Sequence, residues 1–142
     1  RGVGRHTVPS GELCQVCLTL DGRQVRLTAL VDTGNTLTDP ATGRPILVAE
    51  AEGLAELLPQ SLRYGLERGE SPIQLMEQLE PPWRQRFRLV AYRAVGVERG
   101  LLLALRLDRV QVGEEERGPM LAAISPTPLS DGGSYRALIG AE

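Results

Sequence analysis

Asp32 has the most unusual setting among the five aspartates of this 142-residue chain. It directly follows the apolar run Leu27 to Val31 and precedes Thr33 and Gly34. A carboxylate at the end of a buried strand needs hydrogen bonds or a shared proton to stay ionised. Thr33 offers a hydroxyl, and Gly34 lets backbone N–H groups approach without a Cβ in the way. Because all three residue types also favour turns, the tripeptide alone leaves an ordinary strand-end turn as an alternative.

Other kinds of catalytic group are scarce. All 16 basic residues are Arg, so a phosphate-loop Lys, a Schiff-base Lys and a Ser-Lys pair are excluded together. The only histidine, His6, would have to support any Ser-His-Asp or Cys-His site, and a mononuclear zinc site would lack ligands. We therefore expect chemistry based on carboxylates, with no metal and no cofactor.

The two cysteines, Cys14 and Cys17, form a C-x-x-C motif, which can be a redox or metal-binding pair. The flanking residues 12–20 look like a strand, and residues three apart in a strand point to opposite faces. We therefore interpret them as two ordinary strand thiols. Reduced thiols without a disulfide framework fit a cytosolic domain.

The composition is that of one globular domain, 1–142, with 42% hydrophobic and 24% charged residues. A net charge of −2 and a pI near 5.5 argue against nucleic-acid binding. The longest apolar run, Leu101 to Leu105, is strand-sized and far too short for a membrane helix. We expect a soluble fragment of a larger protein, with any targeting or membrane segment outside it.

The residue pattern predicts a mainly β protein. Strands are expected at 11–20 and 24–31, joined by a turn at Asp21-Gly22, and a further strand at 44–48. From Glu50 to Leu79 the apolar spacing is helical, with breaks that favour two or three short helices closed by Pro81-Pro82. Strands are then expected at 86–93, 101–107, 109–112, 120–124 and 135–140. Loops should lie at 94–100 and at 113–118, the latter a solvated acidic tip.

Two segments resemble the signatures of retropepsin-like aspartic proteases. Residues 29–35, with Asp32-Thr33-Gly34, are similar to the active-site strand and turn, and 137–140 resemble the second signature, two bulky apolar residues and a Gly. Residues 87–107 are placed like the flap hairpin. The resemblance implies a pepsin-type single-lobe, closed β-barrel, here with an inserted short helical segment.

A closer resemblance is to the sporulation sigma-E factor-processing peptidase family. Residues 32–46 are similar to its extended D-T-G-N-x-L-x-D-P-x-x-G-x-P motif, and 92–96 with 100–104 are similar to its flap segment. This implies a membrane-anchored protein on the cytoplasmic face of a bacterial membrane, at the septum between forespore and mother cell. It also implies the sigma-E precursor as substrate, activated by removal of its pro-segment, and an activating signalling protein across the membrane.

The resemblance also implies roles for individual residues. Asp32 would be catalytic, with Thr33 cross-linking two active-site turns and Gly34 close to the carboxylates. Support from below would come from the residues Leu138, Ile139 and Gly140. Substrate contacts would come from the loop and the flap, through Asn35, Asp39, Ala94, Val95 and Gly96, although Asn35 and Asp39 have turn chemistry and are loop-shaping residues first.

Peptide hydrolysis of this kind needs two carboxylates about 3 Å apart that share one proton. No second aspartate of this chain follows an apolar strand with Thr and Gly behind it; the other four are Asp21, Asp39, Asp108 and Asp131. The simplest solution is a homodimer through the active-site face, with one Asp32 from each chain.

The chain also departs from the compact viral members of the retropepsin-like proteases. Its helical segment 50–82 is longer, and the flap tip carries Glu98 and Arg99. We also expect the terminal helix and interface strand of a retropepsin to be truncated or absent after Glu142. Three alternatives stay open: an inactive module that binds extended peptides, a β-rich scaffold domain in which D-T-G is only a turn, and a retropepsin-like protease with another bacterial substrate.

Overall fold

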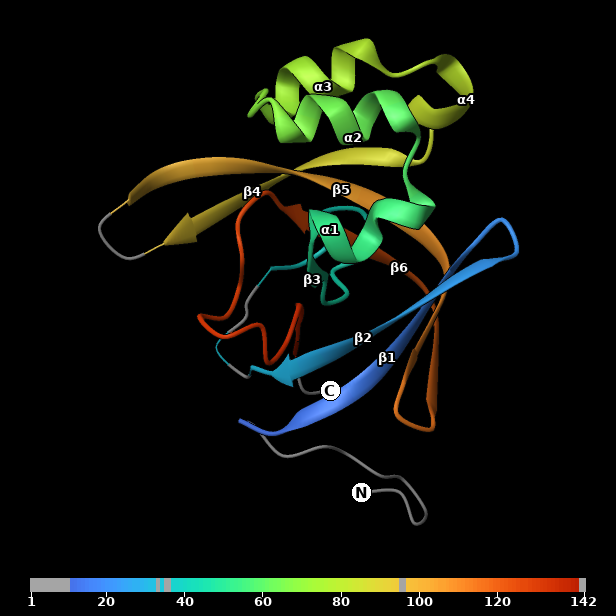
Figure 1. Ribbon diagram of the computed structural model, residues 1–142, viewed down its shortest axis with the longest axis vertical. Helices are drawn as coiled ribbons and strands as arrows, with labels where there is room; N and C mark the ends of the chain where they lie inside the picture. The colour runs from blue at the N-terminus through green and yellow to red at the C-terminus, as the bar shows by residue number, and fades with distance from the viewer. Residues whose placement is uncertain (1–10, 33, 35–36, 95–96, 141–142) are drawn as a thin grey trace.

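Seven strands and a block of short helices form the computed structural model, which describes residues 11–32, 34, 37–94 and 97–140 (Figure 1). The strands are β1 Leu13–Leu20, β2 Arg23–Val31, β3 Leu47–Glu50, β4 Phe87–Ala94, β5 Val97–Val112, β6 Glu115–Ser125 and β7 Ala137–Ile139. The helices are α1 Ala51–Leu54, the 3-10 helix η1 Ala55–Leu57, α2 Gln60–Glu67, α3 Pro72–Gln78 and α4 Pro81–Arg84. The prediction of a mainly β fold with helices inserted in its middle is confirmed.

Six of these strands close into a barrel. Their order is β1-β2-β7-β3-β6-β5, and β5 pairs back onto β1. β4 pairs only with β5 among the described strands, so the β4–β5 hairpin extends away from the barrel (Figure 1). Because β5 has 16 residues, its first half builds the hairpin while its second half pairs with β6 and β1.

The barrel interior is filled by alternating aliphatic side chains from its strands, as expected for a sheet with one buried face. Leu18, Leu105 and Ile139 are among the side chains with almost no exposed surface. A second, smaller cluster packs outside the β3–β6 wall against the hairpin; its buried members are Ile46, Val48, Val90, Ala104, Leu121 and Ala123. This second cluster fixes the hairpin beside the barrel.

The first hairpin is the one that the sequence predicts. Asp21 and Gly22 both have positive φ (51° and 79°), which suits a two-residue turn between twisted strands. Cys14 and Cys17 both lie on β1 as free thiols, and strand geometry sends them to opposite faces, as predicted. Cys14 packs against the core, and this burial raises the pKa of its thiol, although Arg117 opposes the effect.

Of the inserted helices, α2, α3 and α4 lie together over one face of β4 and β5 (Figure 1), whereas α1 and η1 pack against the barrel strands β2 and β3. Ser71 begins α3 with a capping box, since it accepts from the Gln74 N–H while Gln74 accepts from the Ser71 N–H. The predicted end of the segment at Pro81-Pro82 is wrong, because these residues begin α4. Proline suits a first helical position, where no N–H is needed.

Several predicted boundaries differ from the structure. The third strand is β3 at Leu47–Glu50 rather than 44–48, because 45 and 46 pair with the preceding loop at 37 and 38. The final strand is only the three residues of β7.

The hairpins are also longer than predicted. The loop expected at 94–100 is wrong, since β4 runs to Ala94 and β5 begins at Val97. The strands expected at 101–107 and 109–112 are one strand with an irregular register near Leu107. The acidic tip is not a loop: only Gly113 and Glu114 turn, and the next residue already belongs to β6.

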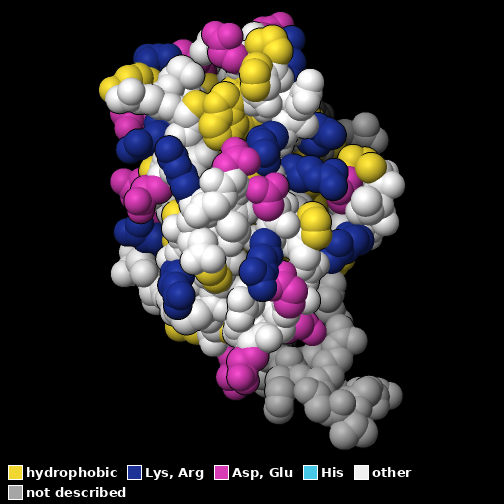
Figure 2. Space-filling view, turned by 90° about the vertical axis from the view of Figure 1, so that its right-hand side faces the viewer, with side chains coloured by type: hydrophobic (Ala, Val, Ile, Leu, Met, Phe, Trp, Pro, Cys, Tyr) yellow, Lys and Arg dark blue, Asp and Glu magenta, His cyan; other side chains and the backbone are white. Residues whose placement is uncertain are grey.

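The face shown in Figure 2 carries basic and acidic side chains intermixed. None of the helices in the described part of the chain has the length and apolar character to cross a membrane.

Gly65 tests the packing of the inserted helices. An added Cβ would lie 2.5 Å from Leu75 Cδ2 and 2.8 Å from Glu70 Oε1. Gly65→Ala should therefore destabilise the domain by about 1–3 kcal/mol in urea unfolding. The matched control is Gly132→Ala, at a position with open space around it. Equal stabilities of the two variants would contradict this packing.

Candidate active site

Asp32 lies directly after β2 and is held by its backbone and its side chain. Its N–H donates to the Ile139 carbonyl over 2.8 Å. Its Oδ1 accepts from the Gly34 N–H over 2.9 Å, which fixes the orientation of the carboxylate. A Cβ on Gly34 would lie 3.2 Å from Oδ1, so a glycine gives this turn the room it needs. The half-buried carboxylate is thus fixed at the end of a barrel strand.

β7 supports this turn. It lies between β2 and β3, parallel to the first and antiparallel to the second, with Leu138 opposite both Leu30 and Val48. Ile139 is buried in the barrel interior, while Leu138 faces the groove beside Asp32. Two of the three residues predicted to lie beneath the turn, Leu138 and Ile139, are therefore in contact with its strand.

Gly140, the third predicted support residue, has a partner that the sequence analysis missed. Arg117 in β6 donates to the Gly140 carbonyl over 3.3 Å and pairs with Glu115 over 2.8 Å. The Arg117 side chain is only 8% exposed, so this acidic segment is partly an internal ion pair rather than a solvated tip. The one signal in the sequence was the arginine that directly follows the three glutamates at 114–116.

A groove of about 530 Å³ opens beside Asp32. Its walls come from the Asp32 turn, the β4–β5 hairpin, the α2–α3 segment and the chain after β6. Most of its lining is aliphatic: Leu37, Val48, Leu66, Leu75, Leu101, Leu102, Leu103, Ile124, Leu129 and Leu138. Such a groove suits a peptide with apolar side chains, and its position places them next to a carboxylate.

Tyr92 lines the groove from the hairpin. Its ring lies across Gly100, its partner in the adjoining strand, because an added Cβ there would come within 2.4 Å of the ring. The hairpin therefore presents a phenol to the groove next to a residue that has no side chain.

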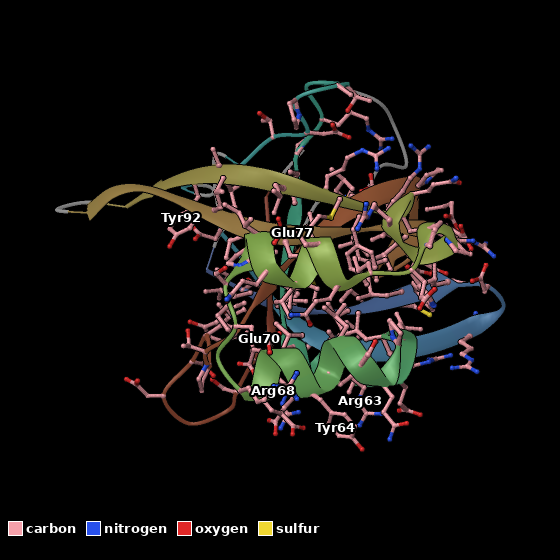
Figure 3. All side chains as sticks on the ribbon, turned by 90° about the horizontal axis from the view of Figure 1, so that it is seen from above. Arg63, Tyr64, Arg68, Glu70, Glu77 and Tyr92 are labelled. Carbon is pink, nitrogen blue, oxygen red and sulfur yellow. The ribbon has the colours of Figure 1, made fainter. Side chains whose placement is uncertain are left out.

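Glu70 is the second carboxylate in the groove wall. It lies between α2 and α3, whereas Arg63 and Tyr64 lie on the outer side of α2 (Figure 3). Its Oε2 accepts from Arg68 over 3.0 Å, and its buried Oε1 has no hydrogen-bond partner among the residues that the structure describes. Because Arg68 already holds this carboxylate, Glu70 is a poor candidate for sharing a proton with Asp32.

The remaining aspartates have structural partners or lie elsewhere. Arg86 bridges Asp21 and Asp108. The pKa of Asp108 lies below its usual range, mainly because it accepts a hydrogen bond from the Asp21 N–H and also because Arg86 is close. Asp131 is exposed in the chain between β6 and β7.

Asp39 shapes the loop that follows the Asp32 turn. Its Oδ1 accepts from the Ala41 N–H, and its carbonyl from the Gly43 N–H. Arg44 then ties this loop to β6 by donating to the Arg117 and Pro119 carbonyls. Asp39 does not line the Asp32 groove, in agreement with a loop-shaping role.

The other predicted site residues come, in the sequence, shortly after Asp32 or at the junction of β4 and β5. Thr33, Asn35, Val95 and Gly96 lie outside the described residues, and Ala94 is placed as the last residue of β4. Within the described ranges, no three His, Cys, Asp or Glu side chains come together as a metal site.

The fold and the groove define a class of protein: a small β-barrel with an aspartate-bearing peptide-sized groove. Comparison of the sequence makes this specific, because the model of the peptidase family described as sporulation factor SpoIIGA matches residues 3–142. The chain belongs to this family.

Individual relatives agree with this assignment. The sporulation sigma-E factor-processing peptidase of Priestia megaterium is 32% identical over 132 residues, which cover 90% of this chain and 43% of that protein. The protein of that name from Bacillus subtilis is 29% identical over 134 residues, with the same coverages. A putative sporulation sigma factor-processing peptidase of Bacillus thuringiensis subsp. kurstaki is 29% identical over 132 residues, 90% of this chain and 81% of that protein. The chain thus spans less than half of two of these relatives. No solved structure matches it significantly.

Arg117 gives a test of how the turn is supported. Arg117→Met would remove both the ion pair with Glu115 and the donor to the Gly140 carbonyl, and we expect a loss of about 2–3 kcal/mol of unfolding free energy. The control Arg109→Met removes an exposed pair with Glu116 and should cost at most about 1 kcal/mol. Similar losses for both variants would contradict the anchoring role of Arg117.

Proposed function

We propose that the chain is a retropepsin-like aspartic endopeptidase domain in which Asp32 is the catalytic carboxylate. The observation that carries the proposal is the placement of Asp32: it ends a barrel strand, is held by Ile139 and Gly34, and faces an apolar groove roofed by a β-hairpin. Membership of a peptidase family supports the same conclusion.

The catalytic unit we propose is a homodimer joined through the active-site face. Aspartic proteolysis requires two carboxylates that share one proton, and Glu70 is already bound by Arg68. Two-fold symmetry would bring a second Asp32 to the first, with Thr33 cross-linking the two turns.

The reaction follows from that pair. The ionised Asp32 takes a proton from a water molecule while the oxygen of that water attacks the scissile carbonyl carbon. The protonated Asp32 of the second chain gives its proton to the carbonyl oxygen. The tetrahedral intermediate then breaks its C–N bond. The leaving nitrogen takes the proton from the first Asp32, while the second Asp32 takes a proton from a hydroxyl of the intermediate as the new carboxyl group forms. The dyad again holds one proton.

Substrate binding would use the hairpin and the groove together. An extended peptide can bind beside β4 and β5 through backbone hydrogen bonds, while its side chains enter the aliphatic groove. Residues at the hairpin tip, Ala94, Val95 and Gly96, and Asn35 beside the catalytic turn would contact it. Tyr92 adds a hydroxyl and a ring to the same wall.

We propose the sigma-E precursor as the substrate, because two of the relatives are named sigma-E factor-processing peptidases. Cleavage within the pro-segment would activate the sigma factor. By resemblance, the whole protein would be anchored in the membrane at the septum, with this domain on the cytoplasmic face, and would respond to a signalling protein across that membrane.

Co-expression of the full-length protein with the precursor tests the catalytic assignment. Asp32→Asn keeps the shape of the side chain but removes its charge, and we expect precursor shortening to slow by about a hundredfold or more. The control Asp131→Asn, in an exposed segment, should process normally. Full processing by Asp32→Asn would contradict aspartic catalysis. Wild-type protein that binds the precursor without shortening it would instead favour a peptide-binding module.

A further inference from the structure

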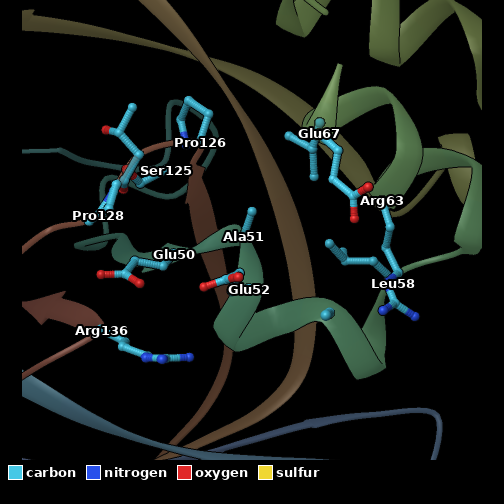
Figure 4. Close-up of a pocket in the computed structure, with 13 residues that line it drawn as sticks. Glu50, Ala51, Glu52, Leu58, Arg63, Glu67, Ser125, Pro126, Pro128 and Arg136 are labelled. Carbon is cyan, nitrogen blue, oxygen red and sulfur yellow. The ribbon is translucent and has the colours of Figure 1, made fainter. Parts of the chain in front are cut away.

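A second cavity, of about 640 Å³, adjoins the Asp32 groove. The two share part of their lining, formed by Leu66 of α2, by Ser125 at the end of β6 and by the next two residues, Pro126 and Thr127. The cavity is bounded by α1, by α2 and by the two ends of the segment that connects β6 to β7 (Figure 4). A chain lying in the Asp32 groove could therefore continue into this cavity.

The cavity differs from the groove in its charge. Three carboxylates line it, Glu50 and Glu52 on the α1 side and Glu67 on α2, together with the guanidinium groups of Arg63 and Arg136 (Figure 4). None of these five side chains forms an ion pair in the described structure. The wall thus carries one more negative than positive charge.

Glu50 is the unusual member of this set, because it is only 7% exposed. One oxygen, Oε2, accepts from the Leu129 N–H over 2.8 Å and so holds the chain after β6. Among the described residues, this neutral backbone N–H is the single partner of the Glu50 carboxylate, and no cation pairs with Glu50. Buried carboxylates are normally compensated by a positive charge, since an isolated one is costly to desolvate.

We propose that this cavity binds a basic side chain, Lys or Arg, of the polypeptide substrate, with Glu50 as its main acceptor and Glu52 and Glu67 at the rim. The positive charge of the substrate side chain would neutralise the excess negative charge of the cavity and give Glu50 an ion-pair partner. The position of the cavity makes it a specificity site for residues some distance from the scissile bond. This inference rests on the proposed peptidase function.

A matrix of enzyme and substrate variants tests the proposal. The substrates are peptides of the precursor pro-segment that span the cut site, with each Lys or Arg replaced in turn by Gln. Glu50→Gln removes the charge but keeps an acceptor for the Leu129 N–H, and Glu56→Gln, at an exposed position outside the cavity, is the control.

For one basic position, wild type and the Glu56 variant should lose about tenfold in kcat/KM when the residue becomes Gln, whereas Glu50→Gln should process both peptides at the same reduced rate. If Glu50→Gln discriminates among all the peptides as wild type does, the proposal is wrong. The added change Arg136→Gln separates a second explanation. Arg136→Gln removes a positive charge from the cavity wall, so it should keep the preference for the basic residue. If it removes the discrimination as Glu50→Gln does, the discrimination does not depend on the negative charge of Glu50, which also overturns the proposal.

Binding measured without cleavage separates this inference from the proposed function. Titration of the same peptides into full-length Asp32→Asn protein should show the same tenfold preference for the basic residue, and the additional change Glu50→Gln should abolish this preference. This preference in a protein whose wild type never cuts would keep the cavity assignment and reject the peptidase. Cleavage by wild type with equal binding of all peptides would do the reverse.

Discussion

The three residues of β7 are the constraint on which the rest of the structure depends. Without them β2 and β3 would have no common neighbour, and the barrel could not close. The Ile139 carbonyl in the same strand holds the Asp32 N–H, so barrel closure and placement of the carboxylate are one event. Arg117 extends this support by holding the next carbonyl, that of Gly140, from inside the β5–β6 hairpin. The rigidity of the site therefore comes from the barrel rather than from its own loop.

The inserted helices relate to function in a different way. α3 contacts β4 and β5, α1 and η1 contact the barrel, and Leu66 and Leu75 form part of the aliphatic groove. Leu66 also belongs to the charged cavity, so α2 separates an apolar compartment from a polar one. Glu50, at the junction of β3 and the insertion, links this arrangement to the chain before β7 through Leu129. The insertion thus enlarges the surface that a substrate can contact.

The sequence predicted local features well because local physics determines them. Asp21-Gly22 requires positive φ, and the aliphatic spacing from Leu54 to Leu79 requires helices. The errors arose where tertiary pairing decides. Gly100 looks like a loop residue until Tyr92 covers it from the facing strand, and the acidic run at 114–116 looks solvated until Arg117 pairs with Glu115. Neither the groove lining nor the partly compensated Glu50 could be predicted, because their residues are far apart in the sequence.

A mixing experiment tests most directly whether two chains share one catalytic centre. Full-length wild type and Asp32→Asn protein are co-expressed in equal amounts. Precursor processing is compared with that of wild type alone at the same total amount of protein. Random pairing leaves about one dimer in four with two Asp32 carboxylates, so the account predicts about a quarter of the activity. Activity of about one half, simply proportional to the wild-type chains present, would contradict a shared dyad.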